Sequence, residues 1–359
     1  MPTKVLFFVN SFSRTGSETL IYEFIQDLNR QGKIEIGIVI CDRKGELVDL
    51  IDKNIPVFYL NQQFSVLDKL LFHTGTDVIG KQIKQIQDSF NANLWYFNTI
   101  SQIHLLSYRD QFHVQTIVHV HELLYNFESL QINDFKTMLQ KCDHLVACSS
   151  LVKDIFAPFF QKPITVINTS IKFSEWKSHR KNKTTKSNKI IKIIGSGTVC
   201  YRKGTDLFIE VADILRSPFI EFIWLGKKNN NAFSEIIRLK NERIKSVSFL
   251  ETNNLEEYLT FLKQGDIFLS TSREESMGLV IMEAQALGMP VVATDSGGST
   301  LLVHEKDGKI VKELNPEAIS IGLKEVMNNL SSYNALDKPK YDYAIEFQKL
   351  SILLQNPLI

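Results

Sequence analysis

The chain has 359 residues, which is long for one domain, so two domains are the first expectation. Its hydrophobic content of 44% and charged content of 23% are ordinary for a soluble globular protein, and a formal net charge of +1 argues against a dedicated nucleic-acid-binding protein. The four cysteines show neither CxxC nor Cys/His ligand spacing, so neither a disulfide framework nor a metal site is expected. The first residues lack a signal-peptide pattern and no apolar stretch reaches transmembrane length, which predicts a cytoplasmic protein.

Short apolar runs alternate with helical stretches through the first half of the chain. Such runs are typical of buried parallel strands, and helices between them favour a doubly wound sheet. Strands are expected at 4–10, 34–42, 55–60, 94–99, 115–122, 144–150 and 164–170, and helices at 19–32 and 64–90.

The pattern stops at residues 172–189, which are polar and basic and have no periodicity. We interpret this segment as a solvated linker, with a phosphate or membrane patch as the alternative. The alternation then restarts. Strands are expected at 190–197, 220–226, 245–251, 266–272 and 290–296, and helices at 204–216, 231–243, 254–263, 278–287 and 316–330.

These patterns predict an α/β protein with two Rossmann-like domains. Residues 1–171 form the first domain, 172–189 the linker and 190–335 the second domain, while 336–359 hold a last amphipathic helix that packs back on the first domain. Ligands in such sheets bind beyond the carboxyl ends of the strands, so the loops after each strand are the candidate sites.

Two glutamates surround the start of one helix in the second half. Glu275 lies in the loop 273–278, and Glu283 lies inside the helix expected at 278–287. The first amides of this helix form an anion site that the helix dipole reinforces. A carboxylate there is able to accept hydrogen bonds from a sugar diol. The spacing alone leaves equally open that Glu283 is a surface residue and Glu275 a charge at the helix end.

The stretch ESMGLVIMEAQALGMPVVAT, residues 275–294, resembles the E-x7-E signature of retaining glycosyltransferases with the GT-B fold, notably glycosyltransferase family 4. This resemblance implies two Rossmann-like doubly wound domains that face a central cleft. It places Glu275 near the donor sugar, as a catalytic residue, and Glu283 at the ribose of the nucleotide. The turn between them is expected to offer backbone amides to the sugar and the diphosphate through Ser276, Met277, Gly278 and Leu279.

A second stretch, residues 193–212, resembles the strand, turn and helix that open the donor domain of this family. Because the class commonly works without a metal, cations have to neutralise the diphosphate leaving group. Lys203 is the matching cation and Arg202 stands beside it. Thr198 departs from the family, whose pattern commonly has an arginine there, so Arg202 is expected to substitute for it. Cations at a helix start conflict with the helix dipole unless an anion binds, which favours the functional interpretation.

The loop at residues 295–311 also resembles the family, but with a departure. A glutamate usually follows the Gly-Gly pair by three positions, and Leu301 stands there instead. Only backbone contacts from Gly297 and Gly298 are therefore expected. Leu301 and Thr198 keep open a catalytically silent protein that binds a nucleotide sugar, whereas a nucleotide-sugar epimerase is disfavoured by the E-x7-E stretch.

Polar residues follow two expected strands of the first half. Gly16 and Ser17 lie between the first strand and the first helix, where the resemblance implies contact with the donor. In HVHE, at residues 119–122, strand alternation places both histidines on one side, and no third ligand at metal spacing accompanies them. The resemblance assigns His121 to the donor sugar as a second catalytic residue, with Glu122 as its neighbour and His119 in strand packing.

The resemblance to glycosyltransferase family 4 implies a retaining, metal-independent glycosyltransferase. It needs no cofactor, and its co-substrate is a nucleotide diphosphate sugar whose base (UDP, GDP or dTDP) stays open. The acceptor is expected to be a glycan or a lipid-linked glycan in cell-surface polysaccharide or lipopolysaccharide assembly. The lysine-bearing stretch 64–87 either packs on the first sheet or lies on an anionic membrane at its inner face.

Overall fold

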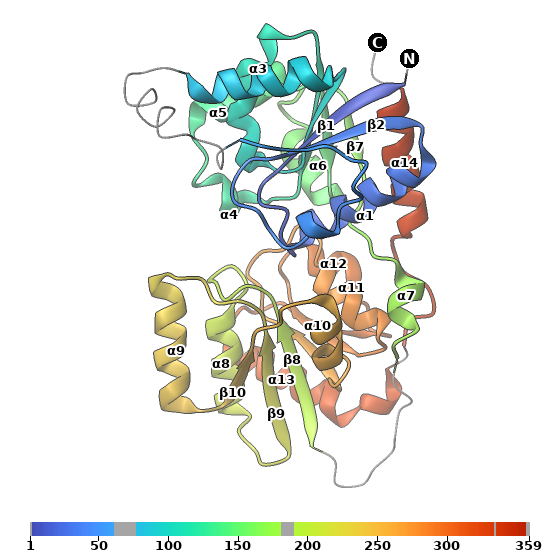
Figure 1. The fold of residues 1–359 in the computed structure, drawn as a ribbon. Helices are drawn as coiled ribbons and strands as arrows, with labels where there is room; N and C mark the ends of the chain where they lie inside the picture. The colour runs from blue at the N-terminus through green and yellow to red at the C-terminus, as the bar shows by residue number, and fades with distance from the viewer. Residues whose placement is uncertain (1, 61–76, 181–189, 334, 357–359) are drawn as a thin grey trace. The chain divides into compact units, whose positions relative to one another are not determined.

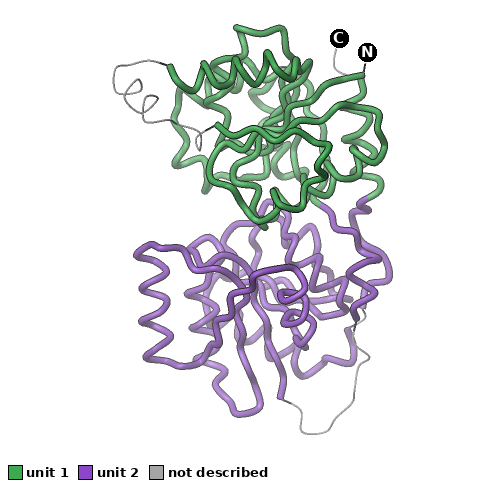
Figure 2. Tube along the Cα trace, viewed as in Figure 1, with its two compact units in different colours: residues 1–169, 344–359 green, residues 170–343 purple. Residues whose placement is uncertain are grey.

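The chain divides into two compact units (Figures 1 and 2). The computed structural model describes residues 2–60, 77–180, 190–333 and 335–356. Unit 1 comprises residues 1–169 and 344–359, and unit 2 comprises residues 170–343. Unit 2 therefore includes residues 172–180, which the sequence analysis assigned to the linker, and part of the segment 336–359.

Unit 1 is built on a parallel seven-stranded sheet in the order β3-β2-β1-β4-β5-β6-β7. The order reverses at β1, as it does in doubly wound folds, and the expected strands of the first half are all present. They are β1 (Thr3–Val9), β2 (Ile34–Ile40), β3 (Val57–Tyr59), β4 (Leu94–Phe97), β5 (Gln115–Val120), β6 (His144–Ala147) and β7 (Ile164–Val166).

Helices cover both faces of this sheet. The main ones are α1 (Gly16–Gln31), α3 (Val78–Phe90), α5 (Ile132–Lys141), α6 (Ser150–Phe156) and α14 (Tyr343–Gln355), with the short α4 (Leu124–Phe127) and the 3₁₀ segments η1 (Val48–Leu50) and η3 (Ile100–Gln111). One core cluster joins Ile83 of α3, Ile103 of η3 and Phe156 of α6 to the sheet. Helix α14 belongs to unit 1, where the ring of Phe347 meets that of Phe24 in α1. Part of the expected helix 64–90 is α3, and residues 61–76 lie outside the described residues.

The loop between β1 and α1 is closed by the chain's own carboxylate. Glu18, which is 3% exposed, accepts hydrogen bonds from the amides of Ser11 and Phe12 through Oε1 and from the amide of Ser13 through Oε2. Phe12 has a φ of 59°, a left-handed conformation that is uncommon outside glycine. Glu18 therefore holds an otherwise unfavourable turn in place.

Unit 2 is built on a parallel six-stranded sheet in the order β10-β9-β8-β11-β12-β13. Its strands are β8 (Ile191–Ser196), β9 (Ile220–Leu225), β10 (Val247–Leu250), β11 (Ile267–Ser270), β12 (Val291–Thr294) and β13 (Gly308–Val311). Its helices are α7 (Phe173–Lys177), α8 (Thr205–Ile214), α9 (Ala232–Ile244), α10 (Leu255–Leu262), α11 (Leu279–Ala286), α12 (Gly298–Leu302) and α13 (Pro316–Asn328), with the 3₁₀ segment η4 (Leu330–Ser332). In unit 2 the sequence analysis missed β13, α7 and α12, which are all five residues or shorter. In unit 1 it also missed the longer η3, α5 and α6.

Two core clusters sandwich the sheet of unit 2. On one face Phe208 of α8, Ile237 of α9 and Leu323 of α13 pack against the sheet. On the other face Phe173 of α7 and Ile281 of α11 do so, together with residues of α10 and α12. The sheet is thus covered on both sides, which leaves the strand ends as the places where polar side chains gather.

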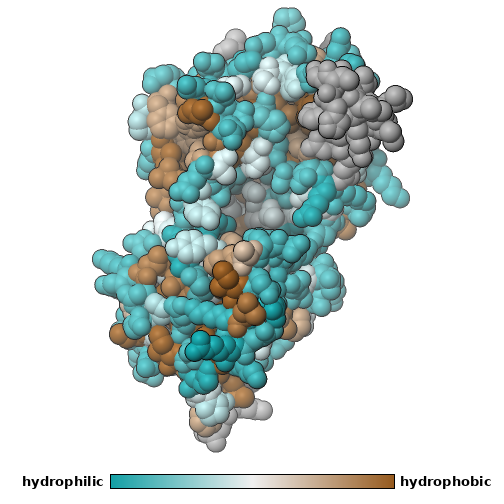
Figure 3. Space-filling model, turned by 90° about the vertical axis from the view of Figure 1, so that its left-hand side faces the viewer, coloured by the Kyte–Doolittle hydropathy of each residue, from teal (hydrophilic) through white to brown (hydrophobic). Residues whose placement is uncertain are grey.

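Apolar side chains reach the surface in small groups that hydrophilic residues interrupt (Figure 3). Ile236 and Leu239 of α9 are examples, with exposed fractions of 59% and 51%. Such scattered exposure is normal for a globular protein. In the described part of the chain, no helix has the length and hydropathy needed to span a bilayer.

The role of Glu18 leads to a first prediction. Glu18→Ala removes the acceptor of three backbone amides, so we expect a loss of about 2–3 kcal/mol in the free energy of unfolding and faster hydrogen exchange at residues 11–13. Glu128→Ala, at an exposed carboxylate, is the matched control. Unchanged exchange at residues 11–13 in Glu18→Ala would contradict the role assigned to Glu18.

Candidate functional site

The carboxylate of Glu275 lies at the carboxyl end of the unit 2 sheet, in the loop after β11. It is 6% exposed and has three side-chain partners. Ser272 Oγ donates to Oε1 at 2.7 Å, Lys203 Nζ forms an ion pair with the same oxygen, and Arg202 lies 3.4 Å from Oε2. The Glu275 amide donates to Ser296 O, and the amide of Gly298 donates to Glu275 O. Both the side chain and the backbone of Glu275 are therefore fixed.

The partners of Glu275 keep it ionised. Burial alone raises the pKa of a carboxyl, but the charges of Lys203 and Arg202, with hydrogen bonds from Lys203 and Ser272, outweigh it and lower the pKa of Glu275 to about 2. Because this carboxylate holds its charge throughout the neutral range, it is suited to stabilising positive charge or orienting hydroxyls. It is a poor proton donor.

Lys203 and Arg202 are placed by a tight approach between two loops. Gly204 has a φ of +65°, and a Cβ there would lie 1.9 Å from Thr271 O, so only glycine fits at this position. Arg202 also donates to Glu274 O at 2.8 Å. Behind them Arg273 binds Asp206 with two hydrogen bonds, at 2.8 and 2.7 Å. The loop before α8 and the loop after β11 thus form one cationic corner around Glu275.

Glu283 lies in the second turn of α11 and has a different environment. Its Oε2 accepts a hydrogen bond of 2.9 Å from the hydroxyl of Tyr258, which lies 3.1 Å from Ser196 Oγ. Burial raises the pKa of Glu283 to about 7, although the Tyr258 hydrogen bond and the charge of Lys203 act in the opposite direction. Glu283 therefore changes its charge near neutral pH, whereas Glu275 does not.

In the turn before α11, backbone amides rather than side chains are the groups available to a ligand. Gly278 is the N-cap with a φ of 106°, and the amides of Leu279 and Val280 begin a helix that offers them no carbonyl partner. Met277 is 1% exposed and belongs to the core, so its side chain is not available to a ligand. A Cβ at Gly298 would lie 2.5 Å from the amide nitrogen and Cα of Met277, which shows how closely the two loops approach. Ser276 is half-buried.

The predicted residues of unit 1 gather at the carboxyl ends of β4 and β5. His121 follows β5, and its ring lies on the same side as that of His119, as strand alternation predicts, with 3.8 Å between the ring centroids and a tilt of 38°. His119 is 1% exposed and its Nδ1 lies 2.6 Å from the hydroxyl of Tyr96. Burial lowers the pKa of His121 to about 3, which keeps it neutral at physiological pH. Nε2 of His121 is buried and has no hydrogen-bond partner among the described residues.

Glu122 and the loop before α1 complete this edge of unit 1. The Glu122 carboxylate accepts hydrogen bonds from Thr99 Oγ1 and from the amide of His121, so it joins the ends of β4 and β5. Gly16 and Ser17 are the first residues of α1, and the Ser17 carbonyl accepts a hydrogen bond from Asn98. Glu122 therefore has a structural role at this edge of the sheet. The hydrogen bond from Asn98, which follows β4, fixes the position of Gly16 and Ser17.

The structure brings most of the predicted residues together within their own units. Arg202, Lys203 and Glu275 touch one another in unit 2, and the charge of Lys203 also acts on Glu283. The sequence analysis missed Ser272, Tyr258 and Ser196. Tyr258 stands 25 positions before its partner on a different helix, and no spacing in the sequence signals such a contact.

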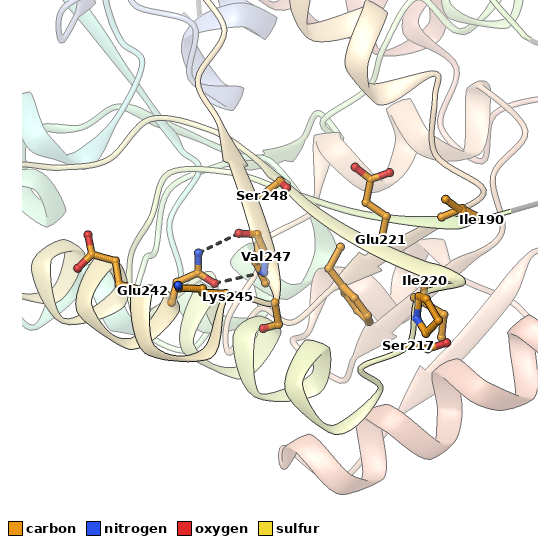
Figure 4. Close-up of a pocket in the computed structure, with 12 residues that line it drawn as sticks. Ile190, Ser217, Ile220, Glu221, Glu242, Lys245, Val247 and Ser248 are labelled. Carbon is orange, nitrogen blue, oxygen red and sulfur yellow. Dashed lines mark hydrogen bonds between the residues drawn. The ribbon is translucent and has the colours of Figure 1, made fainter.

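A hollow of about 610 Å³ lies elsewhere on unit 2, at the amino ends of β8, β9 and β10 (Figure 4). Its lining includes Glu221, Glu242 and Lys245, and the Asn241 side chain there binds both backbone groups of Val247. Ligands of parallel sheets bind at the opposite, carboxyl end, so this hollow is not the candidate site. Within the ranges that the structure describes, no three His, Cys, Asp or Glu side chains form a group able to hold a metal ion.

Curated relatives resemble parts of this chain. D-inositol 3-phosphate glycosyltransferase of Jonesia denitrificans is 30% identical over 135 residues, which is 35% of this chain and 32% of the relative. The enzyme of that name from Corynebacterium urealyticum is 37% identical over 86 residues, covering 24% of this chain and 20% of the relative. An uncharacterised glycosyltransferase of Haemophilus influenzae is 27% identical and covers 57% of this chain and 58% of the relative. The chain thus spans less than two thirds of each.

Solved structures match the whole fold. HepE of Anabaena, in complex with UDP and glucose, has a TM-score of 0.77 at 17% identity, with 98% of this chain and 99% of that chain covered. Sucrose-phosphate synthase of Thermosynechococcus elongatus has a TM-score of 0.79 at 13% identity, with 98% of both chains covered. Residues 175–342, within unit 2, match the family model described as glycosyl transferases group 1. This match covers less than half of the chain and shows that unit 2 is similar to that family, while the two Rossmann-like sheets form the GT-B fold.

Proposed function

We propose that this protein is a retaining glycosyltransferase that moves a hexosyl group from a nucleotide diphosphate sugar to a glycan or a lipid-linked glycan. The observation that carries the proposal is the cationic corner of unit 2, where Lys203 and Arg202 face Glu275 beside the start of α11. A carboxylate for the sugar and a second carboxylate for a ribose then lie on the loop after β11 and on α11, and the cations for a diphosphate lie on the loop before α8 that contacts them.

The charges of this corner suit a diphosphate. Lys203 and Arg202 carry two positive charges against one negative charge on Glu275, whose pKa of about 2 keeps it ionised. The amides of Gly278, Leu279 and Val280 add donors at a helix N-terminus, where anions are favoured. We assign Lys203, Arg202 and these amides to the diphosphate, Glu275 with Ser276 and the backbone of Met277 to the sugar, and Glu283 to the ribose.

The named relatives support a nucleotide-sugar donor. HepE is described in complexes with UDP and with UDP-glucose, and a partial relative from Corynebacterium glutamicum is a GDP-mannose-dependent mannosyltransferase, 28% identical over 137 residues. These names point to a uridine or guanosine diphosphate sugar, and UDP-glucose is the first donor to test.

The proposed reaction keeps the configuration of the donor sugar. The bond between C1 and the β-phosphate oxygen breaks, and the acceptor oxygen forms a new bond to C1 on the same face. The acceptor proton passes to an oxygen of the departing phosphate, so no separate base is needed. Glu275 and the neutral His121 orient the sugar and stabilise its developing positive charge, while Lys203 and Arg202 stabilise the leaving group.

We assign residues 1–171, including Gly16 and Ser17, to the acceptor side and to contacts with the donor, and residues 190–335 to donor binding. A role in cell-surface polysaccharide assembly is the biological part of the proposal. A lipopolysaccharide outer core galactosyltransferase supports it as a structural neighbour, with a TM-score of 0.62. Transfer at the inner face of the membrane is part of this proposal, and the residues first considered for membrane contact include 64–76, which lie outside the described residues.

The deciding experiment is a screen of thermal stability with UDP-, GDP- and dTDP-sugars, followed by transfer assays with the donor that stabilises the protein. Stabilisation together with a glycoside product of retained configuration supports the proposal. Binding without transfer or hydrolysis would favour a catalytically silent binding protein, and no binding would refute the proposed donor site.

Lys203 gives a prediction that separates the diphosphate from the nucleoside. In Lys203→Met we expect the Kd of UDP to rise about 10- to 100-fold and that of uridine to change little, because uridine has no phosphate for the cation to neutralise. Calorimetry of both ligands measures the difference. Lys306→Met, at an exposed lysine, is the control. Equal losses for UDP and uridine would show that Lys203 acts through the fold.

Glu283 gives a prediction about pH. If the ribose hydroxyls donate to an ionised carboxylate with a pKa of about 7, the affinity must rise with pH through this value. From pH 8 to pH 6 the ionised fraction falls about tenfold, so the Kd of UDP-glucose should rise by about the same factor. UDP-glucose is a suitable ligand because both of its phosphates are esterified, so its own charge does not change between pH 6 and pH 8. Glu283→Gln should show a flat profile, and a wild-type profile as flat as that of Glu283→Gln would refute the assignment.

The two proposed catalytic residues give a fourth prediction. Glu275→Gln and His121→Ala should each lower kcat by about 100-fold or more, because each removes a group that acts on the charge developing at C1. His121 lies in unit 1, so His121→Ala should leave the Kd of UDP within about twofold of wild type. Transfer rates near those of wild type in either variant would remove that residue from the mechanism.

A further inference from the structure

The hydroxyl of Tyr258 lies between two polar groups at the carboxyl end of the unit 2 sheet. It is 2.9 Å from Glu283 Oε2 and 3.1 Å from Ser196 Oγ. The three residues come from different elements, since Tyr258 is on α10, Glu283 on α11 and Ser196 at the end of β8. A row of hydrogen bonds thus joins a strand end to the carboxylate assigned to the ribose.

The directions of these hydrogen bonds follow from chemistry. An ionised Glu283 only accepts, so Tyr258 donates to it, and the hydroxyl of Ser196 then donates to the Tyr258 oxygen. The Tyr258 ring is partly buried in the core and meets Trp176 of α7 edge to face, with 6.5 Å between the centroids. Packing fixes the ring, and the ring in turn fixes the carboxylate.

The two oxygens of Glu283 are therefore not equivalent. Oε2 is held by Tyr258, whereas Oε1 has no hydrogen-bond partner in the described part of the chain, and Glu283 is partly exposed. A hydrogen bond to one oxygen restricts the rotation of the carboxylate before a ligand arrives. Its remaining acceptor positions suit a pair of neighbouring hydroxyls better than one hydroxyl, because two parallel hydrogen bonds require a fixed plane.

We propose that Tyr258 is a positioning residue that holds Glu283 for a vicinal diol, and that the row Ser196–Tyr258–Glu283 makes the donor site selective for ribonucleotides. The inference rests on the proposed function, since it concerns the same donor site. It goes beyond the E-x7-E motif, which contains neither Tyr258 nor Ser196. It also selects among the donors left open, because a dTDP-sugar lacks the 2′-hydroxyl and would leave one acceptor position of the fixed carboxylate unused.

The charged surroundings of Glu283 allow a test by pH. Tyr258 from α10 and Lys203 from the loop before α8 both lower its pKa against the effect of burial. Four other elements of the described chain pack against α11. Of these, β11, β12 and α12 carry no charged side chain, and α7 carries Glu175 and Lys177. Lys177 forms an ion pair with Asp337. Tyr258→Phe removes one of the two groups that lower the pKa of Glu283, so this pKa should rise further.

The experiment compares diol recognition in wild type and Tyr258→Phe by calorimetry at pH 8. The probes are UDP and 2′,3′-dideoxy-UDP, with GDP and its dideoxy form as a second pair. Wild type should prefer the ribose form about tenfold or more, and Tyr258→Phe should reduce this preference about three- to tenfold while binding the dideoxy form as before. In the same variant, the midpoint of the pH profile for UDP-glucose should move to higher pH, which a purely structural role would not produce.

Two further variants make the test specific. Tyr108→Phe removes a comparable hydrogen bond from a tyrosine hydroxyl to Asp77, 2.8 Å long, in unit 1, and should change neither the preference nor the midpoint. In a Glu283→Gln background, Tyr258→Phe should have little additional effect, because the two residues act as one unit. An unchanged preference and midpoint in Tyr258→Phe would overturn the inference. Wild type that binds UDP and its dideoxy form equally would refute ribose selectivity and the assignment of Glu283 to the ribose, while the proposed glycosyl transfer stands. Wild type that binds no nucleotide would refute both.

Discussion

A carboxylate removed from water stays ionised only where positive charges or hydrogen-bond donors face it, and Glu275 is placed under this constraint. Lys203, Arg202 and Ser272 satisfy it, and the pKa of Glu275 falls to about 2 as a result. The partners come from segments about 70 positions apart, before α8 and after β11. The geometry of the cationic corner in unit 2 therefore depends on this one buried charge.

Unit 1 also contains a deeply buried carboxylate, but its partners are of a different kind. Glu18 is as deeply buried as Glu275, but its partners are the backbone amides of residues 11–13 rather than cations. The loop after β1 is consequently occupied by the chain's own carboxyl group, whereas the corner in unit 2 retains an excess of positive charge. Two loops in equivalent positions of two similar sheets thus have different capacities for an anionic ligand.

The sequence predicted the elements well where periodicity is strong, and it predicted the site where residues lie within one motif. The apolar runs of β1, β5 and β8 and the Glu275–Glu283 spacing are local signals, and the two-sheet fold and the resemblance of unit 2 to glycosyltransferases rest on them. The short elements α7, α12 and β13 have too few residues for a period to emerge. Contacts made by tertiary packing, such as Tyr258 with Glu283, have no local signal at all, because the distance between two helices is set by the core beneath them.

The two glutamates of the motif lie close together in the sequence but differ in the pKa of their carboxyl groups. They stand eight residues apart on one loop and helix, and Lys203 lowers the pKa of both, yet the pKa of Glu275 is about 2 and that of Glu283 about 7. Glu275 has an ion pair in direct contact, and the neutral hydroxyl of Tyr258 is the only hydrogen-bond partner of the Glu283 carboxylate among the described residues. A hydroxyl offsets less of the cost of burying a charged carboxylate than a cation does. In the free protein the desolvation cost of an ionised Glu283 is therefore only partly offset. Donors from a ligand would complete its hydrogen bonding, and a ribose diol supplies two.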